Sequence, residues 1–304
     1  MTRILVTGAG GFLGAAVARL AVEQGHQVSA LVRNPSSRRV AGLNGKCAIL
    51  AADLADREAV RAALRQASPE IVIHSAWEGV GGAKRASDLQ LDNIATTVAL
   101  LDDSIIAGAS RFIGIGSQAE YGRHDRRIDE TASTEPFLLY GAAKLSACHL
   151  TRQRCAEADI GFAWLRLFSV YGPGDNPNWL IPSVAAALMA GHAPRITAGT
   201  QLWDYLHIDD CASGVLAAAC TTGASGVFNL CSGRAVSVRE IVERLRDLAC
   251  PGLALRFGDI PFGPNQIMHL EGDNARLTSA TGWAPRIAIE DGLADVVSAL
   301  EVAA

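Results

Sequence analysis

The sequence predicts a doubly wound parallel α/β sheet followed by a smaller C-terminal α/β lobe. Three observations support this fold class. In the first half of the 304 residues, short apolar runs alternate with longer helical patterns, as in a parallel sheet covered on both faces. A glycine-rich turn directly follows the first apolar run. A loop segment at 171–177, rich in Gly, Pro, Asn and Asp, then ends this alternation of strands and helices.

The elements follow in order along the chain. Apolar, β-branched runs predict six strands, at 3–7, 27–32, 48–52, 71–75, 111–115 and 163–167. Helices are expected between them near 11–24, 56–66, 88–108 and 138–158. Further helices are expected near 180–190, 208–221, 237–248 and 289–302, with short strands between them. We therefore expect two units, 1–167 and 168–304, with some segments of the second returning to the main sheet.

The composition excludes several classes of protein. The formal net charge is −4, so no basic face for nucleic acid or anionic lipid is expected. No apolar run approaches the roughly 20 residues that span a bilayer, and the first residues lack a signal-peptide pattern. The seven cysteines are scattered, with no CxxC pair and no zinc spacing. We expect a cytoplasmic protein with reduced thiols and without metal, nucleic-acid or membrane partners.

The glycine-rich turn is typical of a dinucleotide site. Gly8, Gly11 and Gly14 have GxxGxxG spacing between the first strand and the first helix. Such glycines allow a tight turn, close approach of a pyrophosphate and close packing of helix on strand. The helix N-terminus then offers free N–H groups to the phosphates. The residues expected to bind the cofactor here are Gly8, Gly10, Gly11, Phe12, Leu13 and Gly14.

The ends of the second and third strands bear on the choice of cofactor. Where an acidic residue would hold the ribose of NAD, this chain has Arg33, followed by Arg38. A guanidinium matches a 2′-phosphate in charge and geometry, so NADP(H) is favoured over NAD(H), although a solvated arginine loop is an alternative. Asp53 follows the third strand and is expected near the adenine, with a helix N-cap as the other interpretation.

Tyr140 and Lys144 form a candidate catalytic pair. Their spacing of four places a phenol and an ammonium on one helix face. An ammonium and a positive nicotinamide ring favour the phenolate and lower the pKa of a tyrosine. The chain has only three lysines, Lys46, Lys84 and Lys144, which makes this pair notable.

Two further residues are expected beside this pair. Ser117 follows a strand at the carboxyl edge, where it can hydrogen-bond the oxygen that Tyr140 protonates. A turn hydroxyl is the alternative. Asn93 can hold Lys144 through a water molecule, with an ordinary surface amide as the alternative.

Together these features resemble the extended short-chain dehydrogenase/reductase family of nucleotide-sugar epimerases, dehydratases and reductases. The resemblance implies a Rossmann domain that binds NAD(P), with Leu54, Ser75, Ala76, Asn93, Tyr140 and Lys144 at the cofactor and Lys144 on the nicotinamide ribose. It also implies a C-terminal lobe that binds a nucleoside-diphosphate sugar. A homodimer is implied as well, built from the helices near 92–108 and 138–158. The matching segments are 7–14, 53–54, 74–76, Ser117, Tyr140, Lys144, Arg166, 171–173, 204–210 and 282–285.

The resemblance also narrows the reaction. Sugar 4,6-dehydratases carry an Asp-Glu pair after the serine, where this chain has Gln118 and Ala119. The expected activity is an NADPH-dependent reductase of a nucleotide-linked 4-keto-6-deoxy sugar, with Tyr140 as proton donor. Ala76-Trp77 and the segment 116–122 look most similar to such reductases. The alternative is an NAD-dependent 4-epimerase, and a non-catalytic NADP-binding sensor is less favoured.

The substrate-binding residues expected from this comparison include two departures from the family pattern. Ser169 stands where the family commonly has Asn, and Trp203 where it commonly has an Arg for the diphosphate. Arg256 or Arg276 is therefore a candidate for the diphosphate. Trp179 and Trp203 are candidates for stacking, with core packing as the alternative. The expected set is Trp77, Ser117, Gln118, Ser169, Trp179 and Trp203.

Overall fold

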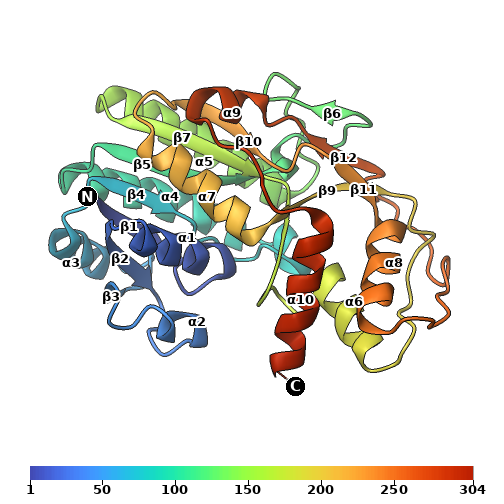
Figure 1. Cartoon of the computed structure of the whole chain (residues 1–304). Helices are drawn as coiled ribbons and strands as arrows, with labels where there is room; N and C mark the ends of the chain where they lie inside the picture. Colours follow the sequence, from blue (N-terminus) through green and yellow to red (C-terminus); the bar gives the residue numbers. More distant parts are fainter. Residues whose placement is uncertain (304) are drawn as a thin grey trace.

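A computed structural model describes residues 1–303 of the chain. Its centre is a seven-stranded parallel sheet in the order β10-β7-β5-β4-β1-β2-β3, with helices on both faces (Figure 1). The order runs outward in both directions from β1 and β4, which is the doubly wound arrangement. The predicted fold class is confirmed.

The strands of this sheet lie close to the predicted runs. β5 extends two residues beyond its expected end, so Ser117 is its last residue. Along β1, Ile4 and Val6 face one layer of helices and Leu5 faces the other, as the two-residue period of a strand requires. The strands are β1 (Arg3–Thr7), β2 (Gln27–Val32), β3 (Ala48–Ala51), β4 (Ile71–His74), β5 (Arg111–Ser117), β7 (Gly161–Leu167) and β10 (Gly226–Leu230).

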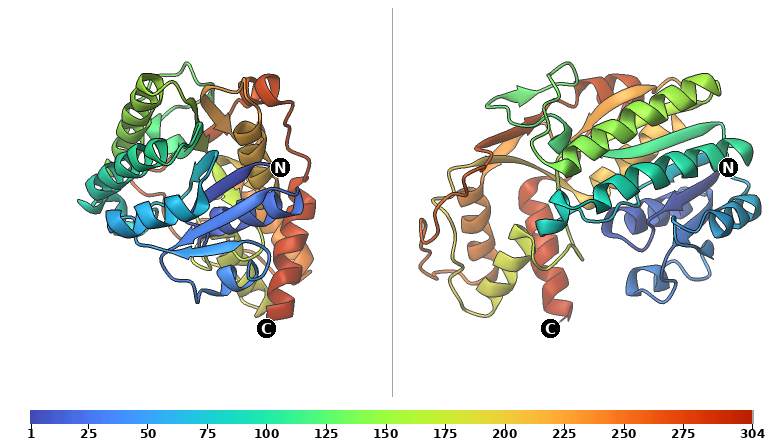
Figure 2. Two further views of the ribbon diagram at one scale, coloured as in Figure 1. Left: turned by 90° about the vertical axis from the view of Figure 1, so that its left-hand side faces the viewer. Right: turned by 180° about the vertical axis from the view of Figure 1, so that it is seen from behind.

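Helices cover the two faces of the sheet in separate layers (Figure 2). One layer contains α1 (Phe12–Glu23) and α7 (Ile208–Cys220), which pack against each other. The other contains α3 (Arg57–Ala67), α4 (Leu89–Ile106) and α5 (Leu139–Glu157). The short helix α2 (Arg38–Ala41), which was not predicted, follows β2.

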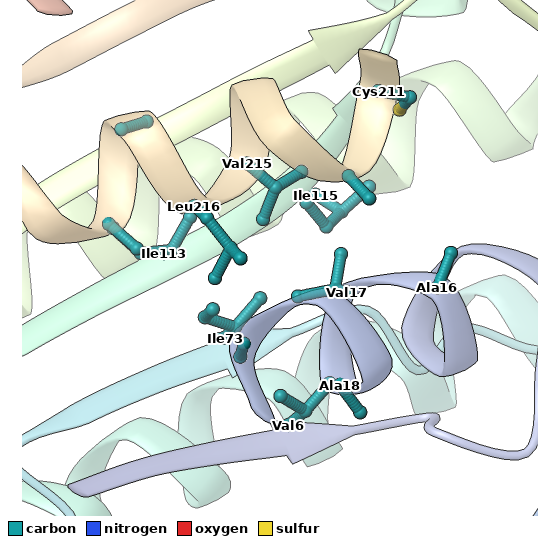
Figure 3. Close-up of a cluster of buried hydrophobic side chains, with 14 of the residues drawn as sticks. Val6, Ala16, Val17, Ala18, Ile73, Ile113, Ile115, Cys211, Val215 and Leu216 are labelled. Atoms are coloured by element: carbon teal, nitrogen blue, oxygen red, sulfur yellow. The ribbon is translucent and has the colours of Figure 1, made fainter. Parts of the chain in front are cut away.

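The core under α1 and α7 joins the two halves of the chain. Figure 3 shows Val17 of α1 and Val215 and Leu216 of α7 converging on Ile73 and Ile113 of the sheet. These five side chains are buried. Fully burying a side chain of this size stabilises a fold by about 1.5–3 kcal/mol. The sheet is therefore held by segments about 200 residues apart in the sequence.

The smaller lobe is built on a second sheet and three helices. Its sheet has the order β11-β9-β12-β6, with β8 paired to β9. The apolar faces of α6 (Leu180–Met189), α8 (Val238–Ala249) and α10 (Ile289–Ala303) form one buried cluster. The strands of this lobe are β6 (Arg127–Ile128), β8 (Ser169–Tyr171), β9 (Leu202–His207), β11 (Ala235–Ser237) and β12 (His269–Gly272). The short helix α9 (Ala275–Thr281) packs instead on β10 of the main sheet and on α7.

The two lobes exchange strands. β10 comes from the second half of the chain and extends the main sheet beside β7. β6 comes from the first half and pairs with β12 in the smaller sheet. The chain therefore crosses between the lobes several times. One of these crossings follows Leu167, where β7 ends.

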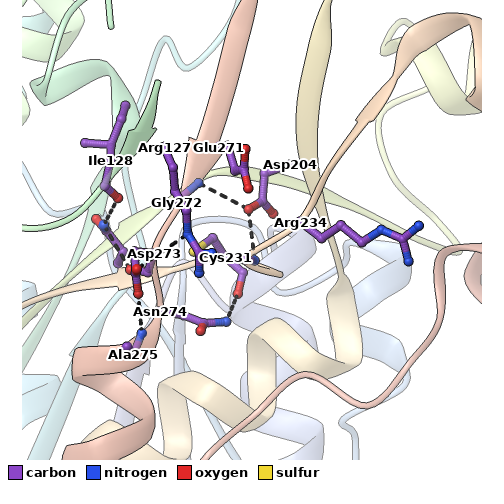
Figure 4. A network of polar contacts seen from close by, with 12 residues as sticks. Arg127, Ile128, Asp204, Cys231, Arg234, Glu271, Gly272, Asp273, Asn274 and Ala275 are labelled. Carbon is purple, nitrogen blue, oxygen red and sulfur yellow. Dashed lines mark hydrogen bonds and ion pairs between the residues drawn. The ribbon is translucent and has the colours of Figure 1, made fainter. Parts of the chain in front are cut away.

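A buried carboxylate ties the strands of the smaller lobe together (Figure 4). Asp204 of β9 accepts hydrogen bonds from the main chain of Ser232 at 2.7 Å, Gly233 at 3.0 Å and Gly272 at 3.3 Å. Burial raises the pKa of Asp204 to about 6, and these donors oppose the rise. Asn274 extends the network by donating to the carbonyl of Cys231 at 3.0 Å.

Within residues 1–303, none of the helices combines the length and the apolar character that a bilayer crossing requires.

Candidate active site

The glycine turn between β1 and α1 has the close contacts that its sequence predicts. Gly8 has φ +68°, and a Cβ there would lie 2.7 Å from the main-chain nitrogen of Ala76. A Cβ on Gly14 would collide with the carbonyl oxygen of Gly8. Gly11 is the N-cap of α1 and no side chain caps its N-terminal amides. These amides can therefore receive a phosphate. Phe12 and Leu13 pack against the core instead.

A cavity of about 800 Å³ lies along this turn and the ends of the neighbouring strands. Its size is within the range of cofactor sites. The predicted cofactor residues that line it are Gly8, Gly10, Gly11, Arg33, Asp53, Leu54, Ser75, Ala76 and Asn93, and Trp77 lines it as well. The helix N-terminus, the glycines and these polar groups fit a dinucleotide, with the turn at its pyrophosphate.

The side chains expected to select the cofactor have partners of their own. The guanidinium of Arg33 forms an ion pair with Glu78, which also lines the cavity. Arg38 is exposed at the start of α2, outside this cavity. Asp53 accepts a hydrogen bond from Ala55 N at 2.9 Å in the turn after β3, while Asp56 is the N-cap of α3.

Lys144 is buried beneath Trp77. It is 3% exposed, and its Nζ donates to the carbonyl oxygen of Ile115 at 2.6 Å. The same Nζ lies 3.7 Å from the centroid of the Trp77 ring, a cation–π distance. Burial lowers the pKa of Lys144 to about 7, and the charge of Glu120 opposes this. Trp77 thus lies between the cavity and this ammonium.

Tyr140 is buried one helical turn before Lys144 on α5. Burial raises the pKa of this phenol, while the Ser117 hydroxyl and the charge of Arg85 lower it. The guanidinium carbon of Arg85 lies 4.4 Å from the centroid of the Tyr140 ring. The edge of Trp77 meets the same ring at a centroid distance of 6.5 Å. Ser117, Tyr140 and Lys144 are thus gathered at the end of β5, as expected for a proton-transfer site.

A buried ion pair fixes the main chain at Ser117. Glu120 is fully buried, and its Oε1 accepts from Ser117 N and Trp164 Nε1, both at 2.9 Å. Its Oε2 accepts from the Nε of Arg166, which is 5% exposed, at 2.7 Å. Gly116 leaves the space for this arrangement, because a Cβ there would lie 2.5 Å from Glu120 Oε1. Glu120 therefore holds Ser117 through its main-chain nitrogen. Its carboxylate does not line the cavity, so it is not placed to act there as an acid or base.

Gln90 and Asn93 of α4 hold the loop that follows β4. The buried amide of Gln90 donates to the carbonyls of Glu78, Gly79 and Lys84 at 3.0–3.3 Å, and accepts from Trp77 Nε1 at 2.8 Å. Asn93 pairs with the main chain of Glu78 in both directions at 3.0 Å. The amide of Asn93 is thus engaged with this loop, where we had expected it to act on Lys144 through water.

The expected substrate residues lie in different environments. Gln118 Oε1 and Trp203 Nε1 are buried without a hydrogen-bond partner in the part of the chain described. Trp203 packs between two apolar clusters, and Trp179 is 41% exposed with its ring against Gly81. Ser169 is half-buried in β8.

The two candidate diphosphate arginines differ in setting as well. Arg256 lines a separate cavity of about 630 Å³ with Arg195 and Asp259. Arg276 lies 5.3 Å from the ring centroid of Phe228.

Sequence reasoning missed Glu78, Arg85 and Gln90. Glu78 and Arg85 belong to the loop between β4 and α4, where no repeating pattern marks single residues. Gln90 carried a weak signal, since it lies three residues before Asn93 and therefore on the same helix face. In residues 1–303, no cluster of three or more His, Cys, Asp or Glu side chains is arranged to hold a metal ion.

The fold and the site define a dinucleotide-dependent enzyme of the oxidoreductase type. The model of the NAD-dependent epimerase/dehydratase family matches residues 4–231, and the chain belongs to this family. The resemblance to the extended short-chain dehydrogenases/reductases is thereby confirmed.

Similar proteins carry several kinds of activity, namely 4-epimerase, 4,6-dehydratase and 4-dehydrogenase. A UDP-glucose 4-epimerase of Streptomyces lividans is 30% identical over 80% of this chain and 80% of its own length. A dTDP-6-deoxy-L-talose 4-dehydrogenase (NAD(P)(+)) of Kitasatospora kifunensis is 27% identical over 99% of this chain and 96% of its own. The structure of Thermus thermophilus UDP-glucose 4-epimerase with NAD superimposes with a TM-score of 0.89 at 22% identity, covering 99% of this chain and all of that one.

Proposed function

We propose that this protein is a 4-epimerase of a nucleoside-diphosphate hexose that retains NAD. The observation that carries the proposal is the Arg33–Glu78 ion pair in the cofactor cavity. Glu78 neutralises the guanidinium that would attract a 2′-phosphate, so the pair presents no net positive charge at that position. This favours NAD, the cofactor of an enzyme that returns its hydride in each cycle. The UDP-glucose 4-epimerases among its relatives support the same proposal.

The residues of the site would divide the chemistry among them. NAD, when bound, supplies the carbon that accepts a hydride from C4 of the sugar and returns it. The Gly8–Gly14 turn and the start of α1 would hold the pyrophosphate. Ser117 would hydrogen-bond the C4 oxygen, and Tyr140 as phenolate would remove the proton of that hydroxyl and later return it. Glu120 would keep Ser117 in register through its main-chain nitrogen. Epimerisation requires the keto sugar to present its other face before the hydride returns.

A 4-keto sugar reductase is the second candidate, and Arg33 is the observation that favours it. The guanidinium lies at the end of β2 and lines the cavity, so a 2′-phosphate that displaced Glu78 would find a matching cation. Tyr140 would then donate its proton to the ketone oxygen. Gln118 and Ala119 argue against 4,6-dehydration in either case, because neither side chain can act as acid or base.

We also propose that the protein forms a homodimer through α4 and α5. The exposed apolar residues Leu91 and Ile106 of α4 and Leu150 of α5 support this, because exposed apolar side chains on packed helices favour association.

One experiment separates the two activities. The purified protein is denatured and the released nucleotide is identified by chromatography. The native protein is then given UDP-glucose, and UDP-galactose is followed by nuclear magnetic resonance. Bound NAD and interconversion that Tyr140→Phe abolishes would support the epimerase. Consumption of added NADPH with a nucleotide 4-keto-6-deoxy sugar, and no interconversion, would replace it with the reductase.

A further inference from the structure

The loop between β4 and α4 places a second cation at the catalytic tyrosine. This loop contains the short 3₁₀ helix η1 (Gly82–Ala86), which packs on α5. Arg85 of η1 lies with its guanidinium carbon 4.4 Å from the centroid of the Tyr140 ring. An ionisable phenol and a permanent positive charge are therefore in contact.

No acidic residue neutralises Arg85 in the part of the chain that the structure describes. Arg85 is half-buried, makes no ion pair there, and its Nε is buried without a hydrogen-bond partner. Two other arginines of the site region are neutralised, Arg33 by Glu78 and Arg166 by Glu120. The charge of Arg85 is thus left free to act on the phenol.

Lys144 is differently engaged. Its ammonium donates to the carbonyl of Ile115 and is covered by the Trp77 ring. The charged groups that face Tyr140 from the surrounding elements are Arg85 of η1 and Glu120 of η2 (Gln118–Glu120), with the Ser117 hydroxyl at the end of β5. Glu120 opposes ionisation of the phenol, so Arg85 is the cation among these groups that favours it.

The position of Arg85 is built into the loop. Gln90 is completely buried and donates to the carbonyl of Lys84, the residue before Arg85, at 3.0 Å. The same amide bonds Trp77 and the carbonyl of Gly79. Gly79 has φ +71° and lies so close to Gln90 that a Cβ would be 2.7 Å from its amide nitrogen. The Gln90 side chain thereby holds the loop at two places, Gly79 and Lys84.

We propose that Arg85 stabilises the phenolate of Tyr140 and is a positioning residue for its proton transfer. The proposal rests on the proposed function in so far as Tyr140 is the acid and base. An opposite charge within 4–6 Å favours the ionised form of a group, and the face of an aromatic ring attracts a guanidinium. Gln90, by holding the loop, would keep the two groups in contact.

The test is a titration of tyrosinate absorbance in the free protein, without turnover. The chain has four tyrosines, and subtraction of the Tyr140→Phe titration isolates Tyr140. Arg85→Gln, titrated with and without Tyr140→Phe, is expected to move the Tyr140 transition to higher pH. Arg85→Lys is expected to keep it near the wild-type position. Lys84→Gln, the adjacent exposed cation in η1, serves as the matched control and should leave it unchanged.

Turnover gives the second measurement. In the pH profile of kcat, the apparent pKa assigned to Tyr140 is expected to rise in Arg85→Gln. If the phenolate acts as base, kcat at pH values below that pKa should fall about tenfold or more. Arg85→Lys should recover most of it. An unmoved Tyr140 transition in folded Arg85→Gln would overturn the proposal, as would a rise in KM with an unmoved pH limb. Since the titration needs no substrate, failure of the proposed function would leave this result standing.

Discussion

The buried Glu120–Arg166 pair allows a quantitative test of how Ser117 is supported. In Glu120→Gln the amide oxygen can still accept from Ser117 N and Trp164 Nε1, the two 2.9 Å bonds of Glu120 Oε1. The amide nitrogen then faces Arg166 Nε, which the carboxylate met at 2.7 Å. Arg166 is 5% exposed, so its charge would remain buried without a counter-ion. Breaking one side of such a pair costs about 3–5 kcal/mol.

The double variant Glu120→Gln/Arg166→Met separates charge from shape. With the cation gone, most of that loss should be recovered, because replacing both members of a buried pair is often close to neutral. Glu130→Gln is the matched control: Glu130 accepts from Asn229 N at 2.7 Å and makes no ion pair within the described residues. It should cost about 1 kcal/mol.

Urea unfolding of the four proteins gives the free energies directly. A loss below about 1 kcal/mol in Glu120→Gln would refute the reasoning, since it would mean that Arg166 finds another partner or water. A double variant no more stable than the single one would refute it as well.

Three further predictions concern the cofactor, acid stability and association. Gly14→Ala should weaken NAD binding in calorimetry by more than about tenfold, because its Cβ collides with Gly8, whereas Gly223→Ala, with open space around it, should bind normally. Burial, and then the charge of Lys144, lowers the pKa of His74 to about 3. The unfolded chain therefore binds a proton that the native protein does not, and stability should fall as pH drops from about 6.5 towards 3. Urea unfolding at several pH values should show a smaller slope for His74→Gln. Leu150→Glu on α5 should yield monomers in light scattering, while Leu248→Glu on α8, at a similarly exposed position, should not.

The parallel sheet could be predicted because its strands are nearly continuous apolar runs. A strand such as β1 is buried on both faces, and its sequence shows this directly. β10 has a similar pattern, but its partner β7 precedes it by about 60 residues, and no local pattern encodes that pairing. β6 has two residues, too few for any period to appear.

The candidate site divides in the same way. The glycine turn and the Tyr140–Lys144 spacing are local, so the sequence alone predicts them. The partner of Arg33 is Glu78, 45 positions away, and the aromatic cover of Lys144 is Trp77 on another element. Such contacts depend on how loops fold over the sheet edge, and our proposal of NAD over NADP rests on one of them.

The exchange of β6 and β10 between the lobes has a consequence for motion. Two domains joined by a single hinge can swing apart to admit a ligand, whereas these two lobes are connected by several chain crossings. Opening the lobes would have to move all of these connections together. Access to Lys144 and Tyr140 must then depend on smaller movements, and the loop carrying Trp77 and Arg85 is the segment that covers both. The rate of cofactor or substrate exchange should therefore be set by the Gln90 contacts rather than by the interface between the lobes.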